Sequence, residues 1–223
     1  MKAPDRLETE RLVLLKPRVS DAKAIFERYA GDADVTRLLG WPRHLSTSDT
    51  DAFLKVSDAS WEQWPAGPYL VRLRETNELL GSTGFEFHGP HRASTGYVLA
   101  KDAWSKGYAT EALRAIVDLA PRLGVMQLSA LCHPSHLASQ RVLQKCGFVQ
   151  DEQGTRQVEY PNLAPGIRQD ALRFDLHVRE HEERHDKRQR RKGATMPANS
   201  NWGRRDDVTR AIIRQAARAQ LKC

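Results

Sequence analysis

The stretch GYVLAKDAWSKGYATEAL, residues 96–113, decides the fold of this chain. It starts as an apolar strand, passes through a short polar loop to Gly107, and continues as a helix whose apolar residues recur every three or four positions. A helix start exposes unpaired N–H groups and the positive end of the helix dipole, which suit a phosphate or pyrophosphate. Gly107 would let the backbone approach such an anion, and Lys106 adds a positive charge. By itself, the pattern is also typical of an ordinary strand-to-helix turn.

Predicted strands and helices alternate on both sides of this stretch. Apolar and polar residues alternate around a turn at Thr76–Asn77, which predicts an antiparallel hairpin, whereas later strands are separated by helices and must cross over. The predicted strands are 11–18, 69–74, 79–88, 94–100, 127–132, 148–149 and 171–178, and the predicted helices are 20–30, 49–64, 109–120 and 136–146. These elements predict an α+β fold in one domain, built on a mixed sheet.

Composition and cysteine usage exclude several classes of protein. The chain has 223 residues, of which 40% are hydrophobic, enough to bury a core. No run approaches the ~18 apolar residues of a membrane helix, and the opening MKAPDRLETER lacks the apolar segment of a secretory signal, so we predict a cytoplasmic protein without membrane contact. Cys132, Cys146 and Cys223 form no CxxC pair and no cluster with histidines, which predicts neither a disulfide framework nor a metal site.

The charge of the chain is unevenly distributed. Residues 1–178 hold 22 basic and 22 acidic residues, whereas 179–223 hold 13 basic and 6 acidic residues, which is the whole net charge of +7. We therefore predict a globular domain over 1–178 and a basic tail over 179–223, with a disordered linker and a short helix over 208–222. The run KRQRRK at 187–192 predicts weak contact with a polyanion, and a solvated tail without a partner is the alternative.

Part of the central stretch resembles motif A of the GNAT superfamily of acetyl-CoA-dependent N-acetyltransferases. That motif is [Gln/Arg]-x-x-Gly-x-[Gly/Ala], and residues 104–109, WSKGYA, are similar to it with Trp104 in place of the usual Gln or Arg. The run WSKGYATEA is typical of the RimJ/RimL-type branch, and residues 7–12, LETERL, match the usual opening of that branch.

A second block resembles motif B of the same superfamily. Residues 133–139, HPSHLAS, precede a helix that ends in Gly147-Phe148, and His136 stands where Asn is commoner. The motifs occur in the order of the family, and the resemblance covers about residues 6–178. It implies a mostly antiparallel sheet flanked by helices, with a splayed central strand.

The resemblance implies acetyl-CoA as the cosubstrate, bound along the strand that ends near Ala100. Backbone groups of Val98, Leu99 and Ala100 would pair with the pantetheine as another strand does. An N–H near Leu99 or Ala100 would polarise the thioester oxygen. The further residues that would bind the cofactor, chiefly its pyrophosphate, are Trp104, Ser105, Lys106, Gly107, Tyr108, Ala109 and Thr110.

In this superfamily the amine attacks the thioester directly, which leaves two proton transfers to assign. Ser139, the serine of motif B, would donate a proton to the departing thiolate, and a local helix hydrogen bond is its alternative role. Glu86, in the strand next to the cofactor strand, is the candidate base, with a water-mediated route as the alternative. His88 and Glu159 are substitutes on the substrate side.

Two other residues have open interpretations. His136 would either contact the cofactor or cap the helix that follows it. Trp41, in the loop between the first helices, would either line the acceptor site or pack in the core.

The leading functional interpretation is an N-acetyltransferase, without a metal, that acts on a primary amine. The acceptor is either a protein N-terminus or a small molecule, and fold similarity does not choose between them. The alternatives are a non-catalytic CoA-binding module and a ribosome- or RNA-associated protein attached through its tail. The presence of both Glu86 and Ser139 favours catalysis over the module.

Overall fold

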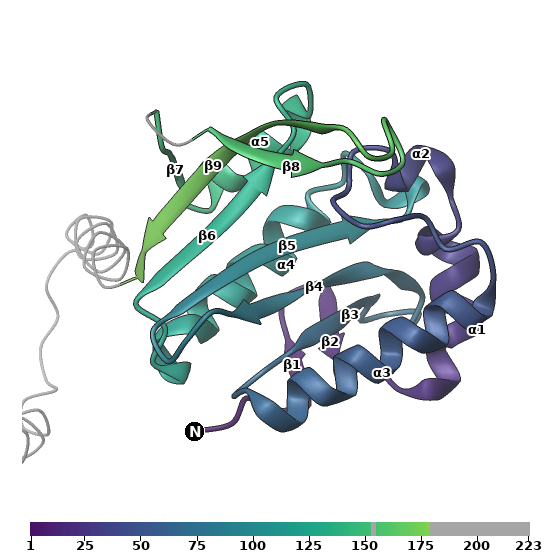
Figure 1. Ribbon diagram of the computed structural model, residues 1–223. Helices are drawn as coiled ribbons and strands as arrows, with labels where there is room; N and C mark the ends of the chain where they lie inside the picture. Colours follow the sequence, from purple (N-terminus) through teal and green to yellow (C-terminus); the bar gives the residue numbers. More distant parts are fainter. Residues whose placement is uncertain (153–154, 179–223) are drawn as a thin grey trace, which may run out of the picture. The chain divides into compact units, whose positions relative to one another are not determined.

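The computed structural model describes residues 1–152 and 155–178, which fall within one compact unit of the chain (Figure 1). The predicted basic tail 179–223, with its linker and its helix over 208–222, lies outside the described residues. Within the described part of the chain, no helix has the length and apolar character that crossing a bilayer requires.

Helices and strands alternate much as the sequence predicts. The strands are β1 (Arg6–Glu8), β2 (Leu12–Leu15), β3 (Pro68–Leu73), β4 (Leu79–Phe87), β5 (Arg92–Leu99), β6 (Gln127–Cys132), β7 (Val149–Gln150), β8 (Arg156–Glu159) and β9 (Arg168–His177). The α-helices are α1 (Ala22–Ile25), α2 (Ala33–Thr36), α3 (Thr47–Gln63), α4 (Tyr108–Leu119) and α5 (Leu137–Lys145). Shorter turns of 3₁₀ or π geometry are η1 (Val19–Asp21), η2 (Phe26–Ala30), η3 (Lys101–Ala103) and η4 (Ala120–Leu123).

One mixed sheet organises the described residues. Its strand order is β1-β2-β3-β4-β5-β6-β9-β7, and β8 also pairs with β9. Of the strand pairs in this part of the chain, only β5 and β6 are parallel. They are parallel because α4 carries the chain from the end of β5 back to the start of β6. The predicted α+β fold, with a mostly antiparallel sheet flanked by helices, is confirmed.

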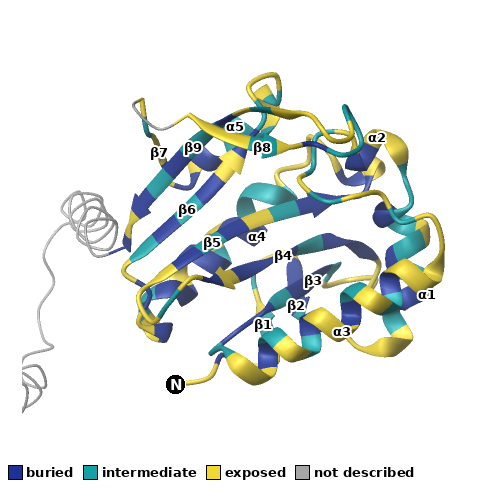
Figure 2. Ribbon diagram, viewed as in Figure 1, coloured by how far each residue is buried: buried dark blue, intermediate teal, exposed yellow. Residues whose placement is uncertain are grey.

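Helices cover both faces of the sheet, and each face has its own core. Leu113 and Ile116 of α4 are fully buried in a cluster that includes Leu99 of β5. On the other face, Ile25 of α1 belongs to a cluster that includes Val98 of β5. Figure 1 shows α3 in front of the sheet and α4 behind it, and Figure 2 shows that the outward side of α3 is exposed. Neighbouring residues of β5 therefore serve opposite faces, as strand geometry requires.

The structure differs from the predicted elements in a few places. The elements β1, α2 and β8 were not predicted, because each has only three or four residues and shows no measurable periodicity. The predicted helix 20–30 is a succession of η1, α1 and η2. The predicted strand 11–18 ends at Leu15, shortly before Pro17, which has no N–H group to donate to a neighbouring strand.

Candidate active site

A cleft opens in the sheet where β5 and β6 separate. The two strands pair at three positions, 92–94 against 127–129, and diverge beyond them. Because β5 remains paired with β4 along its length, its other edge is open from Thr95 onward. A cleft of about 540 Å³ occupies this opening, a volume typical of small-molecule sites. The splayed central strand is therefore present.

The open edge of β5 presents the backbone groups of alternate residues. Ala100 N–H donates to the Leu80 carbonyl in β4 at 2.7 Å. Because successive residues of a strand bond to opposite sides, Val98 also faces β4, whereas Tyr97 and Leu99 direct their backbone groups to the opening. This corrects the expectation that Val98 and Ala100 offer backbone groups to the pantetheine. The Leu99 N–H is the group that the geometry offers for polarising a thioester.

The end of β5 leads into an exposed loop that presents the N-terminus of α4. Trp104 Nε1 donates to the Leu99 carbonyl at 2.8 Å, which fixes the start of this loop. Ser105 (φ 61°) and Gly107 (φ 81°) both adopt the left-handed backbone conformation, which glycine adopts without steric cost. Gly107 immediately precedes Tyr108, the first residue of α4, so the first N–H groups of this helix lie beside it.

Thr9 and Arg11 of the N-terminal segment bind Glu111 of α4, and we call these three residues the loop clamp. Glu111 Oε1 accepts hydrogen bonds from the Thr9 hydroxyl at 2.6 Å and from Arg11 N–H at 2.8 Å, and Arg11 Nε donates to Oε2 at 2.7 Å. Arg11 Nη1 also donates to the Lys106 carbonyl at 3.0 Å, and its guanidinium lies 4.7 Å from the centroid of the Tyr108 ring. Burial favours the neutral form of Glu111, but the bonds from Thr9 and Arg11 outweigh it and lower its pKa. The clamp therefore links the segment LETERL to the turn at Gly107.

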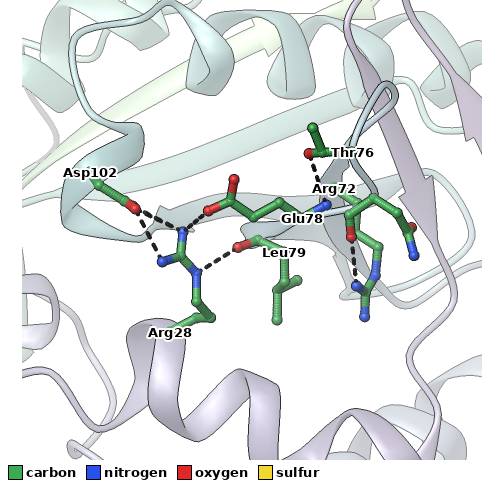
Figure 3. Close-up of polar contacts among 7 residues, drawn as sticks. Arg28, Arg72, Thr76, Glu78, Leu79 and Asp102 are labelled. Carbon is green, nitrogen blue, oxygen red and sulfur yellow. Dashed lines mark hydrogen bonds and ion pairs between the residues drawn. The ribbon is translucent and has the colours of Figure 1, made fainter.

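A second cluster ties the beginning of the same loop to the sheet (Figure 3). Arg28 donates to the Asp102 carboxylate at 3.0 Å, to the Glu78 carboxylate at 2.8 Å and to the Leu79 carbonyl at 2.9 Å. Asp102 lies in η3, between β5 and Gly107. Arg28 thus joins η2, β4 and the β5–α4 connection.

On the α4 face, the cleft contains a pair of hydroxyl groups. Tyr97 OH and Ser139 Oγ lie 2.8 Å apart, and Tyr97 OH also donates to the Ser139 carbonyl at 3.1 Å. This contact bridges β5 and α5 across the opening. The Cys132 thiol, at the end of β6, also lines the cleft near Ser139. Burial raises the pKa of Tyr97 and of Cys132, so both side chains are neutral at pH 7.

On the opposite face, a carboxylate lies at the edge of the cleft. Glu86 of β4 is directly opposite Ser94 of β5, and Ser94 Oγ donates to Glu86 Oε2 at 3.1 Å. His88 Nε2 lies 2.8 Å from Ser94 Oγ. Because the single Ser94 proton points to Glu86, Nε2 of His88 is the donor in this arrangement. The three side chains form a chain of hydrogen bonds from the cleft to the surface.

The outer wall of the cleft is made by two loops that Asn162 holds together. Asn162 Nδ2 donates to the carbonyls of Thr36 and Trp41, both at 2.8 Å, and its Oδ1 accepts from Arg43 N–H at 2.7 Å. These bonds join segments that are 119–126 residues apart in the sequence. Trp41 from one loop and Tyr160 from the other line the cleft.

Comparisons with known proteins agree with this geometry. Residues 11–149 match the family model described as acetyltransferase (GNAT) domain. The uncharacterized N-acetyltransferase YoaA of Bacillus subtilis (strain 168) is 32% identical over 162 residues, which cover 71% of this chain and 90% of that protein. This chain belongs to the GNAT family. It is an acetyltransferase.

Solved GNAT structures share the fold at lower identity. A GNAT acetyltransferase from Bacillus anthracis has a TM-score of 0.66 and 24% identity, with 78% of this chain and 99% of that chain covered. RimL, a ribosomal L7/L12 α-N-protein acetyltransferase in complex with coenzyme A, has a TM-score of 0.66 and 21% identity, with 76% and 95% covered. At these identities the likeness concerns the fold alone.

Some of the candidate residues of this GNAT chain line the cleft, and others do not. Ser139 and Glu86 both line the cleft, from opposite faces of the sheet, and Trp41 lines its outer wall. His88 reaches the site through Ser94. Glu159 does not belong to the cleft lining. Its carboxylate accepts the Gly166 N–H at 2.8 Å, which corrects its expected role on the substrate side.

The structure excludes one of the two roles that the sequence left open for His136. It occupies the N-cap position of α5, but its side chain makes no capping hydrogen bond, so the capping interpretation is wrong. The half-buried ring lines the cleft instead. Burial, and to a lesser extent the neighbouring His133, lowers the pKa of His136, so the imidazole is neutral at pH 7.

Several residues of the site escaped the sequence analysis. Tyr97 has the appearance of a core residue in an apolar strand, and the pattern of cysteines gives Cys132 no role in a site. Ser94, Tyr160 and Asn162 lie outside the family motifs and carry no signal of their own. The contacts of Tyr97 and Asn162 arise between segments that are distant in the sequence, which spacing rules do not reach.

Proposed function

We propose that this GNAT acetyltransferase transfers the acetyl group of acetyl-CoA to a primary amine while both substrates are bound. The observation that supports the proposal best is the cleft at the β5–β6 opening, which is lined from both faces of the sheet. The open edge of β5 suits a cofactor, and the face with Glu86 suits an amine. Each substrate therefore has its own approach to the cleft.

The residues around the opening fit acetyl-CoA, which would supply an activated acetyl thioester. The first N–H groups of α4 and the Lys106 ammonium would hold the pyrophosphate, next to the left-handed turn at Gly107. Backbone groups of Tyr97 would pair with the pantetheine as an added strand does, whereas the Leu99 carbonyl already accepts the Trp104 indole N–H. The Leu99 N–H would stabilise the negative charge that develops on the thioester oxygen.

Glu86 is the proposed base. It would take the proton that the amine must lose through bridging water molecules, because Glu86 is opposite Ser94, five residues from Leu99 along β5. A proton taken by Glu86 could reach the surface through Ser94 and His88 if both hydrogen bonds reverse, so that Glu86 donates to Ser94 Oγ and Ser94 donates to an unprotonated Nε2 of His88. In this proposal His88 belongs to the route and does not touch the acceptor.

Ser139 is the proposed proton donor to the departing thiolate, and Tyr97 supports it. If Tyr97 OH donates to the Ser139 carbonyl, its oxygen accepts the Ser139 proton, so the two hydroxyls are coupled. When the Ser139 hydroxyl turns to donate to the thiolate, Tyr97 OH can donate to Ser139 Oγ, and its raised pKa keeps Tyr97 protonated in that role.

An acceptor screen tests the proposed function. Acetyl-CoA is incubated with the protein and a panel of amines and N-terminal peptides, and release of free thiol is measured. We expect thiol release with at least one amine and an increase in Tm when CoA is added. A CoA-dependent increase in Tm without transfer to any acceptor would favour the non-catalytic CoA-binding module.

A further inference from the structure

We infer from the cleft walls that the acceptor is a monoamine attached to an apolar, flat body, and not a polyamine. The inference rests on the proposed function, because it concerns the amine that reacts in this cleft. It specifies three properties of the acceptor: one positive charge, an apolar group beside it, and a size that fits the cleft of about 540 Å³ together with the acetyl end of the cofactor.

The first argument is the charge of the lining. Among the described residues that line the cleft, Glu86 is the only one with a charged side chain. His136 also lines it, but its lowered pKa leaves the ring neutral. A second ammonium group brought into this cleft would lose its hydration without gaining a carboxylate partner, which is costly. The lining therefore matches one positive charge and disfavours several.

The second argument is the apolar surface on the same face as Glu86. Glu86 is opposite Ser94, and Ser94 lies on the same face of β5 as Val98. Val98 packs in the buried cluster that includes Ile25 of α1 and Leu54 of α3. Trp41 and Phe53 pack against this same cluster and line the cleft. Val98 lies four residues beyond Ser94 on this face, toward Leu99, so an amine at the Leu99 end of the cleft has an aromatic and aliphatic surface beside it.

The third argument is that hydrogen bonds within the chain hold this surface in place. Three hydrogen bonds from Asn162 hold the Trp41 loop, and one of their partners, Thr36, is fully buried. Val158, from the strand that leads to Asn162, also lines the cleft. A preformed wall loses little conformational entropy on binding, so burial of an apolar group against it increases affinity directly.

The experiment compares four acceptors with the full-length protein. These are 2-phenylethylamine, a tripeptide that begins with phenylalanine, ethanolamine and spermidine. We expect kcat/KM for at least one of the two phenyl-bearing acceptors to exceed that of ethanolamine and spermidine by about tenfold or more, because only these bury an apolar ring. Comparison of the free amine with the peptide distinguishes a small molecule from a protein N-terminus. A kcat/KM for spermidine or ethanolamine that equals or exceeds both phenyl-bearing acceptors overturns the inference.

Variants of the wall provide a second test. Trp41→Phe should lower kcat/KM for the preferred phenyl-bearing acceptor several-fold more than for ethanolamine, and Val158→Asp should raise kcat/KM for spermidine. Leu45→Ala is the matched control, because Leu45 lies in the same loop, is 75% exposed and does not line the cleft. Equal losses for all acceptors in Trp41→Phe, or no gain for spermidine in Val158→Asp, would contradict the inference.

The increase in Tm with CoA is measured for each variant and separates this inference from the proposed function. CoA binding with transfer to the wrong class of amine refutes the acceptor class alone. Absence of transfer to all four acceptors and to the wider amine panel refutes the proposed function, and the acceptor class with it.

Discussion

At the scale of single residues, the site surrounds one carboxylate with neutral polar groups. Burial raises the pKa of Tyr97 and Cys132 and lowers that of His136, so each of these side chains is kept in its uncharged form. Glu86 is exposed, accepts a hydrogen bond from Ser94, and keeps contact with water. A developing negative charge on the α4 face would therefore meet donors that are protonated at pH 7.

The first prediction concerns the hydroxyl pair. Ser139→Ala should lower kcat by about 10²-fold, because a donor that acts as the thiolate leaves stabilises the transition state. The apparent KM for acetyl-CoA should change little. Tyr97→Phe should lower kcat less, since Ser139 remains. Steady-state measurements of thiol release check both variants, and a Ser139→Ala kcat within a few-fold of the parent would assign the donor role to water.

The second prediction concerns a buried hydroxyl without a partner. Tyr160 is 3% exposed, and its hydroxyl has no hydrogen-bond partner among the residues that the structure describes. Tyr160→Phe should therefore leave the free energy of unfolding unchanged or raise it by up to about 1 kcal/mol. Tyr69 is the matched control, because it is also buried but donates to the Pro4 carbonyl at 2.7 Å. Denaturant unfolding should show a loss of about 1 kcal/mol in Tyr69→Phe. An equal loss in Tyr160→Phe would mean that its hydroxyl is bonded.

At the scale of elements, the proposed cofactor site consists of the open edge of β5 and the N-terminus of α4, which the loop at Gly107 connects. Its inward side is a continuous apolar stripe buried against the sheet, and its N-terminus ends in the exposed loop at Gly107. The loop clamp holds one side of this loop, and Arg28 holds the other through Asp102. Ion pairs from distant segments thus position a turn that makes few apolar contacts of its own.

The third prediction uses two glycines with the same backbone conformation. Gly107 (φ 81°) and Gly124 (φ 77°) are both left-handed, so Gly→Ala at either position should cost about 1 kcal/mol of stability. A Cβ on Gly107 would lie 3.4 Å from Arg11 Nη2, beside the proposed pyrophosphate site, whereas one on Gly124 meets nothing within 4 Å. Only Gly107→Ala should reduce the CoA-dependent increase in Tm. Equal increases in both variants would show that the anion does not bind at this turn.

The fourth prediction follows from the lowered pKa of Glu111. A carboxyl whose pKa is lower in the folded state stabilises the fold above its ordinary pKa, and this contribution disappears as pH falls through the lowered value. At pH 7, Glu111→Gln should therefore have a free energy of unfolding about 1–2 kcal/mol below that of the parent, and a lower Tm. The difference should shrink below about pH 4.

The control for the clamp is Glu10→Gln, an exposed glutamate of the same segment. The Tm of the parent, of Glu111→Gln and of Glu10→Gln is measured by thermal unfolding between pH 3 and pH 7, at intervals of about half a pH unit. A difference between parent and Glu111→Gln that stays constant with pH, or a similar one in Glu10→Gln, would show that the ionised Glu111 carboxylate does not stabilise the clamp.

At the scale of the whole molecule, the sheet itself separates the two proposed substrates. The proposed cofactor site lies at the open edge of β5, where β5 and β6 diverge. The proposed amine site lies on the face of the sheet that α1–α3 and the loops joined by Asn162 cover. Residues 1–178 carry equal numbers of basic and acidic side chains, so the excess positive charge lies in the sequence beyond them.

The fifth prediction concerns the tail. Deletion of residues 179–223 should leave the CoA-dependent increase in Tm and acetylation of a small amine within about twofold of the full-length protein. The deletion must retain Val178, which is 2% exposed and whose N–H donates to the Met126 carbonyl at 3.0 Å. Any binding of RNA should weaken with salt in the full-length protein and be lost in the shortened one. Loss of folding or of activity would show that the tail packs on the domain.

Local patterns in the sequence were sufficient for most of the elements and for the turn at Gly107 that precedes α4. Neighbouring residues encode three of these features: the spacing of apolar residues in α4, the hairpin of β3 and β4, and the glycine that precedes α4. They can do so because backbone geometry repeats over a few positions. The family motifs added the splayed strand and Ser139. These features depend on residue type and spacing, which a sequence displays directly.

The tertiary structure alone decided which groups meet at the site. The alternation set by β4 turned the Leu99 N–H, and not that of Ala100, toward the opening. Strand order brought Tyr97 to Ser139, 42 residues away, and the loop after β8 brought Asn162 to the Trp41 loop. Contacts of this kind depend on the register and order of strands, which are fixed by packing of the whole sheet and not by the spacing of residues along the chain.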